Sequence, residues 1–523
     1  MRFSLALFFT GLSCRQACVL ALMLGALNVL SFAPFQLWPI QLLSLASVWV
    51  ILIAHPEWNK KQAAALGFCF AFGCFLVGVS WLFVAMHRYG DMPAVLALIF
   101  VAVLAAYLSL FSALTFAVCV PAKRRWKLTP LTLLLLFLPA SWMLSELARR
   151  YLFTGFPWLS TGYAYLASPL AGFAPVLGVF GVSGIAALAA GTLGYLVLEQ
   201  KRRVYVVAFL GLIFLTGWGL QKIEWTSAFG QPISVRLIQG NINQGQKFDA
   251  EFVDSSLALY ANMMTAKPAD VIAIPETALP ILTSQLPSDY LSGLNNFARS
   301  SGSHLFLGVV QDDGENRYAN SVAGLGGQAA SSEQTHFYRY DKSHLVPFGE
   351  YVPIGFRWFV ELMQIPLGDF TQPAALQPAM QVRDQSVMPN ICYEDAFGDE
   401  IASQLRAQAE TSSGAASILL NLSNLAWYGD AIAMPQHLQI SQMRALETGR
   451  PMLRSTNTGA TAIIDARGQV QAQLPFLTRA TLEGRVQGMQ GLTPYVRFGD
   501  SGVGLLAGLA IVLSFLLGKR KPS

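Results

Sequence analysis

Two kinds of hydrophobic pattern divide the chain. From the N-terminus to about residue 221, apolar stretches long enough to cross a bilayer alternate with short polar loops. The stretches fall at about 16–33, 38–54, 62–86, 93–120, 128–146, 168–198 and 204–221, and another follows at about 502–518. This pattern predicts a multi-span α-helical membrane protein with about eight transmembrane helices. Residues 1 to about 14 predict a short interfacial or extended first helix, with a cleaved signal peptide as the alternative.

Between residues 225 and 497 the pattern is that of a domain outside the bilayer. Strands are predicted at 234–239, 270–275, 304–310, 386–391, 416–422, 452–455 and 460–465, and helices at 249–264, 290–298 and 436–446. Alternating strands and helices indicate one α/β domain with layers on a sheet. The expected domains are therefore a seven-span region at 1–224, the α/β domain at 225–497, and a last spanning helix with a basic tail at 498–523.

Composition agrees with a membrane protein. Of the 523 residues, 54% are hydrophobic and only 12% are charged, which is too apolar for an ordinary soluble protein. The cysteines form no C-x-x-C pair and the histidines are scattered, so we expect no metal site and no cofactor. Neither a phosphate-binding glycine loop nor a basic, aromatic nucleic-acid surface is visible. Nucleic acid is therefore not an expected partner.

Basic residues in the loops predict the orientation. They cluster after the even-numbered spans, at Lys60, Lys61, Lys123, Arg124, Arg125, Lys127, Lys201, Arg202, Arg203, Lys519, Arg520 and Lys521. Arg149 and Arg150, after the fifth span, are the one conflict. The positive-inside rule places both termini in the cytoplasm. We therefore expect the large domain on the opposite side of the membrane, which in a bacterium is the periplasm or the cell exterior.

Cys392 is the only cysteine in the long polar region. It follows the predicted strand 386–391, and Tyr-Glu-Asp after it indicates a turn into a helix. A strand-to-helix elbow exposes a nucleophile and aims helix N-terminal amides at it. The alternative is a small buried core residue. In an oxidising compartment, where cysteines usually pair, a solitary thiol needs burial or catalysis as its reason.

Two charged residues could supply what a nucleophilic thiol needs. Glu276 directly follows the predicted strand 270–275, and Lys342 lies in the segment 338–350. A carboxylate can take the thiol proton and return it to a leaving group. A lysine ammonium can stabilise a tetrahedral oxyanion. For either residue taken alone, the alternative is a solvated surface position.

In this chain order, Glu276, Lys342 and Cys392 resemble the Glu-Lys-Cys arrangement of the nitrilase, or carbon–nitrogen hydrolase, superfamily. The surrounding segments resemble its membrane-bound branch, the apolipoprotein N-acyltransferase family. They are Gln239–Ile242, Pro275–Ala278, Tyr340–Pro353, Asn390–Glu394, Asn421–Asn424, Trp427–Asp430, Met443–Glu447 and Arg454–Gly459. Two positions depart from that pattern: Phe248, where the family commonly has tryptophan, and Leu425, where it often has aspartate.

The resemblance implies an α-β-β-α sandwich for the 225–497 domain. It also implies transfer of a fatty acyl chain from a membrane phospholipid to the N-terminal amine of diacylglyceryl-cysteine in apolipoproteins, through a thioester. Cys392 would be the nucleophile, Glu276 the general base and Lys342 the oxyanion stabiliser. Supporting residues would be Glu350, which orients Lys342 or helps the proton transfers, and Tyr393 and Glu394, which shape the pocket. The substrate-binding candidates are Phe248, Trp427, Phe356 and Trp358.

An apolar stretch from Tyr351 to Leu376 favours lipid chemistry independently. Phe356, Phe359, Val360 and Met363 recur at helical spacing, and Trp358 adds a ring typical of membrane interfaces. We expect a lid that dips into the outer leaflet, or else a stripe that packs on the domain's own core.

Two other functions stay open. A membrane-anchored amidase or nitrilase could hydrolyse a small amide with the same three residues. A transporter or receptor could use the domain only to bind a ligand, and would be expected to carry paired charges within its spans. Glu146, near the end of the fifth span, is the clearest intramembrane charge.

Overall fold

The computed structural model describes residues 5–199, 202–247, 249–314, 317–326, 337–352, 355, 357, 370–373 and 376–519. The chain divides into two compact units. One comprises residues 1–83, 93–224 and 498–523, and the other comprises residues 84–92 and 225–497. The second unit therefore includes a short segment that, in the order of the sequence, falls between two stretches of the first unit.

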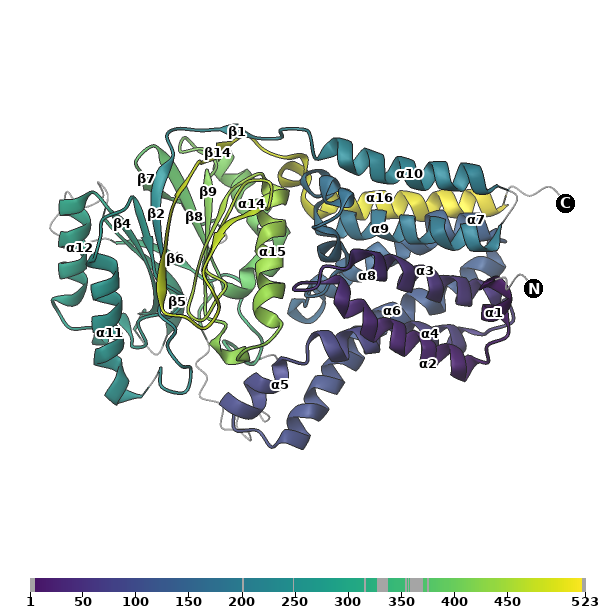
Figure 1. The fold of residues 1–523 in the computed structure, drawn as a ribbon, viewed down its shortest axis with the longest axis horizontal. Helices are drawn as coiled ribbons and strands as arrows, with labels where there is room; N and C mark the ends of the chain where they lie inside the picture. Colours follow the sequence, from purple (N-terminus) through teal and green to yellow (C-terminus); the bar gives the residue numbers. More distant parts are fainter. Residues whose placement is uncertain are drawn as a thin grey trace. The chain divides into compact units, whose positions relative to one another are not determined.

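The first unit is helical (Figure 1). Its main helices are α1 (Leu5–Thr10), α2 (Cys14–Asn28), α3 (Trp38–Ala54), α4 (Lys60–Gly78), α6 (Ala94–Arg125), α8 (Leu138–Tyr151), α9 (Ala174–Leu198), α10 (Arg203–Leu220) and α16 (Pro494–Lys519). Within the described ranges, seven helical segments are long and apolar enough to cross a membrane, and α3 is a shorter apolar helix. The predicted multi-span architecture is confirmed.

The third span is shorter than predicted. We expected it to reach residue 86, but α4 ends at Gly78. The Trp81 indole N–H donates to the Gly78 carbonyl at 3.1 Å, and the Ser80 hydroxyl donates to the Val77 carbonyl at 2.8 Å. These side chains satisfy carbonyls that a helix end leaves without partners, so the helix can stop there. The chain continues as α5 (Leu82–Val84) and the π-helical turn η2 (Ala85–Tyr89).

The two arginines that conflicted with the loop-charge pattern are buried. Arg149 donates to the Trp158 carbonyl at 2.8 Å and to the Ser160 hydroxyl at 3.1 Å. Arg150 forms an ion pair with Asp500 at 3.4 Å. Both residues are therefore structural groups inside the helical unit.

The second unit contains two six-stranded sheets and a small pair of strands. One sheet has the order β13-β2-β3-β4-β5-β6, the other β12-β11-β10-β9-β8-β7, and β1 pairs with β14. In the first sheet β2, β3 and β4 are parallel, and in the second β8, β9 and β10 are parallel. The strands are β1 (Ser227–Ala228), β2 (Ile233–Gln239), β3 (Val271–Ala273), β4 (His304–Asp312), β5 (Tyr318–Leu325), β6 (Tyr338–Asp341), β7 (Met380–Val382), β8 (Gln385–Ile391), β9 (Ile418–Ser423), β10 (Met452–Thr456), β11 (Ala462–Ile464), β12 (Val470–Gln473), β13 (Ala480–Val486) and β14 (Met489–Gln490).

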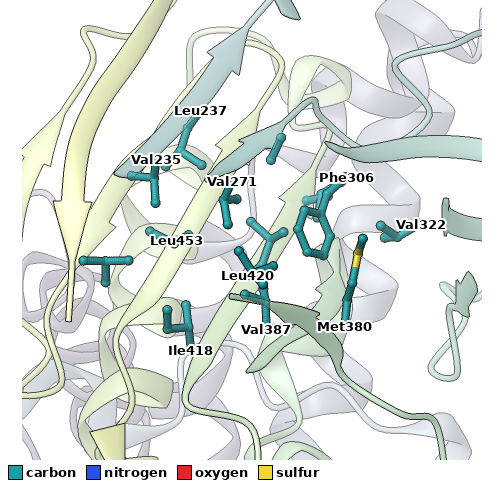
Figure 2. Packing of buried hydrophobic residues seen from close by; sticks show 14 of the residues in the cluster. Val235, Leu237, Val271, Phe306, Val322, Met380, Val387, Ile418, Leu420 and Leu453 are labelled. Carbon is teal, nitrogen blue, oxygen red and sulfur yellow. The ribbon is translucent and has the colours of Figure 1, made fainter. Parts of the chain in front are cut away.

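The sheets pack face to face, and helices cover their outer faces. Figure 2 shows the core between the sheets, with Val235 and Phe306 from the first sheet and Leu420 and Leu453 from the second. Helices α11 (Ala250–Thr265) and α12 (Tyr290–Ser301) bury apolar residues against the first sheet, and α14 (Gly398–Ala409) and α15 (Ala433–Thr448) against the second (Figure 1). This is the predicted α-β-β-α sandwich.

Candidate active site

Parallel strands bring their carboxyl ends to one edge of a sheet, where α/β proteins place their ligands. Glu276 follows β3, Cys392 follows β8 and Asn424 follows β9. Cys392 lies at a sharp elbow with a φ of +50°, between β8 and the short helix η8 (Cys392–Ala396). A left-handed backbone at a residue other than glycine costs about 1–3 kcal/mol and requires support from its surroundings. The predicted strand-to-helix elbow is present.

Glu276 and Lys342 lie together in a buried hydrogen-bond network. The Lys342 Nζ atom is 3.1 Å from Glu276 Oε1 and 2.8 Å from Glu350 Oε1. Asn320 Nδ2 donates to the same two oxygens, at 2.8 Å and 2.7 Å. The backbone N–H of Asn424 donates to Glu276 Oε2 at 3.0 Å. Both Glu276 oxygens are thus fixed by donors.

The charges of the network favour a protonated thiol beside an ionised carboxylate. Burial raises the pKa of the Cys392 thiol, the charge of Glu276 and a hydrogen bond to it raise it further, and Lys342 offsets only part of this. For Glu276, burial alone would raise the pKa, but Lys342 and Asn320 outweigh burial and lower it. Burial would lower the pKa of Lys342, but Glu276 and Glu350 hold it well above its ordinary value. The pKa shifts therefore favour a neutral Cys392 thiol and an ionised Glu276 carboxylate.

Glu394 joins the cysteine elbow to the lysine loop. Its carboxylate accepts the Ile391 N–H at 2.6 Å, the Ser343 N–H at 2.6 Å and the Tyr340 hydroxyl at 3.1 Å. Ile391 precedes the cysteine and Ser343 follows the lysine, so one carboxylate fixes the spacing of both. The ring of Tyr393, half-buried, packs edge-on against Phe397.

A second lysine lies within this centre. Lys247, on the loop after β2, is buried, and its Nζ atom donates to the Thr277 hydroxyl and lies 3.5 Å from the Glu276 carbonyl oxygen. Burial lowers its pKa to about 8, although Glu276 and Cys392 act in the opposite direction. Its charge therefore changes close to neutral pH.

Behind the elbow lies a buried polar network centred on His437. The His437 Nε2 atom is 3.1 Å from the Cys392 carbonyl oxygen, and Nδ1 is 3.1 Å from Arg454 Nη2. Arg454 also pairs with Asp395 at 2.9 Å, and all these groups are buried. Since a guanidinium can only donate, Nδ1 accepts and Nε2 carries the proton. His437 thus donates to the backbone carbonyl of Cys392.

The substrate-binding candidates are only partly described. Trp427, in the short helix η9 (Ala426–Tyr428), is exposed and packs edge-on against Tyr89 with ring centroids 6.1 Å apart. Phe248, Phe356 and Trp358, with most of the predicted lid, lie outside the described residues. In the part of the chain that the structure describes, no group of histidine, cysteine or carboxylate side chains could hold a metal ion.

Sequence comparison decides which family this site belongs to. Residues 24–192 match the family described as Apolipoprotein N-acyltransferase N-terminal domain, and residues 234–495 match Carbon-nitrogen hydrolase. A protein of Ralstonia nicotianae named Apolipoprotein N-acyltransferase is 46% identical, over 97% of this chain and 94% of its own length. One of the same name from Nitrosomonas europaea is 43% identical, over 96% and 98%. The chain belongs to the apolipoprotein N-acyltransferase family.

Among solved structures, the C. elegans NitFhit protein is similar over 55% of this chain and 65% of its own, with 15% identity and a TM-score of 0.38. An amidase from Nesterenkonia sp. is similar over 52% of this chain and 94% of its own, with 15% identity and a TM-score of 0.36.

In this apolipoprotein N-acyltransferase family member, Glu276, Lys342 and Glu350 form one buried ion-paired group, and the charges of all three act on the pKa of the Cys392 thiol. Leu425, one of the two departures from the family pattern, is buried, and the contact to Glu276 comes from the backbone of Asn424. That contact therefore does not depend on the residue type at 425.

Three residues of the site were not predicted: Lys247, Asn320 and His437. Lys247 had a signal, because it stands directly before Phe248 in the segment that follows the Gln239–Ile242 motif. His437 lies in the second turn of α15, the helix that also carries the Met443–Glu447 motif, and this was only a weak signal for a place near the site. Asn320 lies in a strand that was not predicted and had no signal.

Proposed function

We propose that this protein transfers a fatty acyl chain from a membrane phospholipid to the N-terminal amine of a diacylated apolipoprotein, through a thioester on Cys392. The observation that carries the proposal is the arrangement of Glu276 and Lys342 next to a protonated thiol, in a domain joined to membrane-spanning helices. The names of the relatives identify the class of acceptor.

In the first half-reaction, Glu276 takes the Cys392 proton as the sulfur attacks the ester carbonyl carbon. Among the described residues, Glu276 and Glu350 engage two of the three N–H donors of Lys342, which leaves the third for the oxyanion. The carbon–oxygen ester bond then breaks. The departing lysophospholipid oxygen receives the proton from Glu276, and the acyl group stays on sulfur.

In the second half-reaction, the acceptor amine attacks the thioester carbonyl carbon. Glu276 takes one proton from the nitrogen, and the carbon–sulfur bond breaks. The Cys392 thiolate then recovers that proton from Glu276, which restores the resting thiol and carboxylate. No cofactor is needed for this cycle. The loop charges support a periplasmic catalytic domain on the inner membrane, where the apolar lid would admit the lipid chain.

The test is the acyl-enzyme itself. Purified protein given phospholipid alone should gain one fatty acyl group on Cys392, removable by neutral hydroxylamine. Adding a diacylated lipopeptide should discharge it and place the label in an amide. Cys392→Ala should never acquire the adduct. Product formation without an adduct in rapid-quench mass spectrometry would contradict the thioester route.

A further inference from the structure

Lys247 is placed by the same polar groups that place the catalytic base. Asn457 holds its loop through both its side-chain atoms, accepting the Ile242 N–H at 2.9 Å and donating to the Ile242 carbonyl at 2.8 Å. Asn424 donates from its side chain to Gln244 Oε1 at 2.8 Å, while its backbone N–H donates to Glu276. The position of Lys247 is therefore coupled to that of Glu276.

The lysine contacts the backbone turn that presents Glu276. Its ammonium donates to the hydroxyl of Thr277, the residue directly after the base, and faces the Glu276 carbonyl oxygen. Thr277 has a φ of +44°, an unfavourable conformation for a β-branched residue. A buried donor on its side chain helps to hold this strained residue, and with it the direction of the Glu276 side chain.

The ammonium also balances the charge of the centre. Glu276 and Glu350 bring two negative charges and Lys342 brings one positive charge, so these contacting groups carry one net negative charge. Attack by Cys392 adds negative charge beside them, first on sulfur and then on the oxyanion. Nearby negative charge opposes that step, and a second cation favours it. The Cys392 thiol is close enough to Lys247 to affect its pKa.

We propose that Lys247 is a positioning residue of the catalytic centre, which holds the Glu276–Thr277 turn and neutralises the excess negative charge when Cys392 attacks. The titratable and charged groups of the cluster are Glu276 after β3, Lys342 and Glu350 after β6, Cys392 after β8 and Tyr428 in η9. The inference rests on the proposed function, because acyl-enzyme formation is its first readout.

The experiment measures acyl-enzyme formation from phosphatidylglycerol vesicles alone, by rapid-quench mass spectrometry between about pH 6 and 9.5. The Lys247 ammonium is charged below its pKa of about 8 and neutral above it. The wild-type rate should therefore fall as pH rises through about 8. Lys247→Met should lower the rate at neutral pH by about tenfold, as one lost pKa unit would, and should abolish the fall. Lys247→Arg should keep the charge and move the fall to higher pH.

Two further variants separate charge from structure. Lys267→Met removes an exposed lysine that pairs with Glu483, and should change neither the rate nor its pH dependence. Thr277→Val removes the hydroxyl but keeps the charge, so its rate should drop while the fall near pH 8 remains. If Lys247→Met keeps that fall, or has the wild-type rate, the proposal is wrong.

A second readout makes the two proposals distinguishable. Alkylation of Cys392 by iodoacetamide requires the thiolate but no acyl transfer. At neutral pH, where the Lys247 ammonium is charged, its loss should raise the thiol pKa and slow alkylation by about tenfold, and the difference should vanish well above pH 8. If no acyl-enzyme forms in the wild type, the thioester route fails, and alkylation still decides the role of Lys247. Equal alkylation of wild type and Lys247→Met at neutral pH would overturn it.

Discussion

At the scale of single residues, the main property of this site is which of Cys392 and Glu276 carries a proton. The Cys392 pKa is raised and the Glu276 pKa is lowered, so the resting enzyme carries a thiol and a carboxylate. The pKa of Lys342 is held well above its ordinary value by Glu276 and Glu350, so Lys342 is a cation in the resting site.

Lys342→Arg should lose most of the activity although the charge is kept. The ammonium is fully buried and fits between two carboxylate oxygens, 3.1 Å and 2.8 Å away. Arginine is larger and planar, so it cannot reproduce one compact donor aimed at the oxyanion. Loss of one such donor costs about 3–4 kcal/mol, or a factor of about one hundred or more in rate. Near-normal formation of the acyl-enzyme would remove Lys342 from the catalytic residues.

At the scale of elements, the elbow depends on helix α15 behind it. His437→Leu removes the donor to the Cys392 carbonyl and leaves Arg454 facing a side chain that cannot accept. Leaving buried polar groups without partners costs about 1–3 kcal/mol each. We expect at least about a tenfold slower acylation and a lower melting temperature. His437→Gln can still donate and accept, and should retain more of both. Equal loss in the two variants would mean that only the imidazole shape matters.

Strand β4 supports the base in a different way. A Cβ atom on Gly308 would lie 2.0 Å from the Pro275 carbonyl oxygen and 2.7 Å from the Glu276 Cα atom. Gly308→Ala should therefore displace Glu276, lower the acylation rate by about a hundredfold and destabilise the domain by about 1–3 kcal/mol. Gly293→Ala is the matched control, because nothing lies within 4 Å of that position on α12. It should leave the acylation rate unchanged, and unfolding by denaturant would measure the stability of both variants.

The sequence correctly predicted strands whose buried positions are mostly apolar residues. Strands β2, β4 and β8 are mostly buried and rich in apolar residues, and they were found within a few residues. Strand β5 was missed because Asn320 and Ser321 interrupt its pattern, although both are buried. Asn320 is polar because it serves Glu276 and Glu350. The polar residue Asn320, which made the strand hard to predict, is therefore also the residue of the strand that contacts the site.

The same reasoning explains which site residues were found. Glu276 and Cys392 follow predicted strands directly, and a motif marks Lys342, so local sequence was sufficient. Lys247 and His437 reach the site only through the pairing of the two sheets and the packing of α15. A lysine in a polar loop and a histidine in a helix have many other uses, and one-dimensional spacing does not distinguish them.

At the scale of the whole molecule, the loop charges predict the orientation in the membrane. A reporter fused after residue 200 or after Gly518 should behave as cytoplasmic, and one inserted at the exposed turn around Gly414 should behave as exported. With Arg149 and Arg150 occupied inside the helical unit, the remaining basic clusters agree with one another. An exported signal after residue 200 would invert the arrangement.

The position of segment 84–92 in the sequence has a consequence for the order in which the second unit is synthesised and folds. The segment belongs to the second unit, yet it is translated and threaded between two early membrane helices before Trp225 leaves the ribosome. Much later, η9 is synthesised, and Trp427 then packs on Tyr89 while Gly429 faces Val84. Domains generally fold as units from the N-terminus as they emerge. Here η9, which is synthesised late, packs against segment 84–92, which is synthesised early. A fragment that starts at Trp225 therefore lacks the residues against which η9 packs.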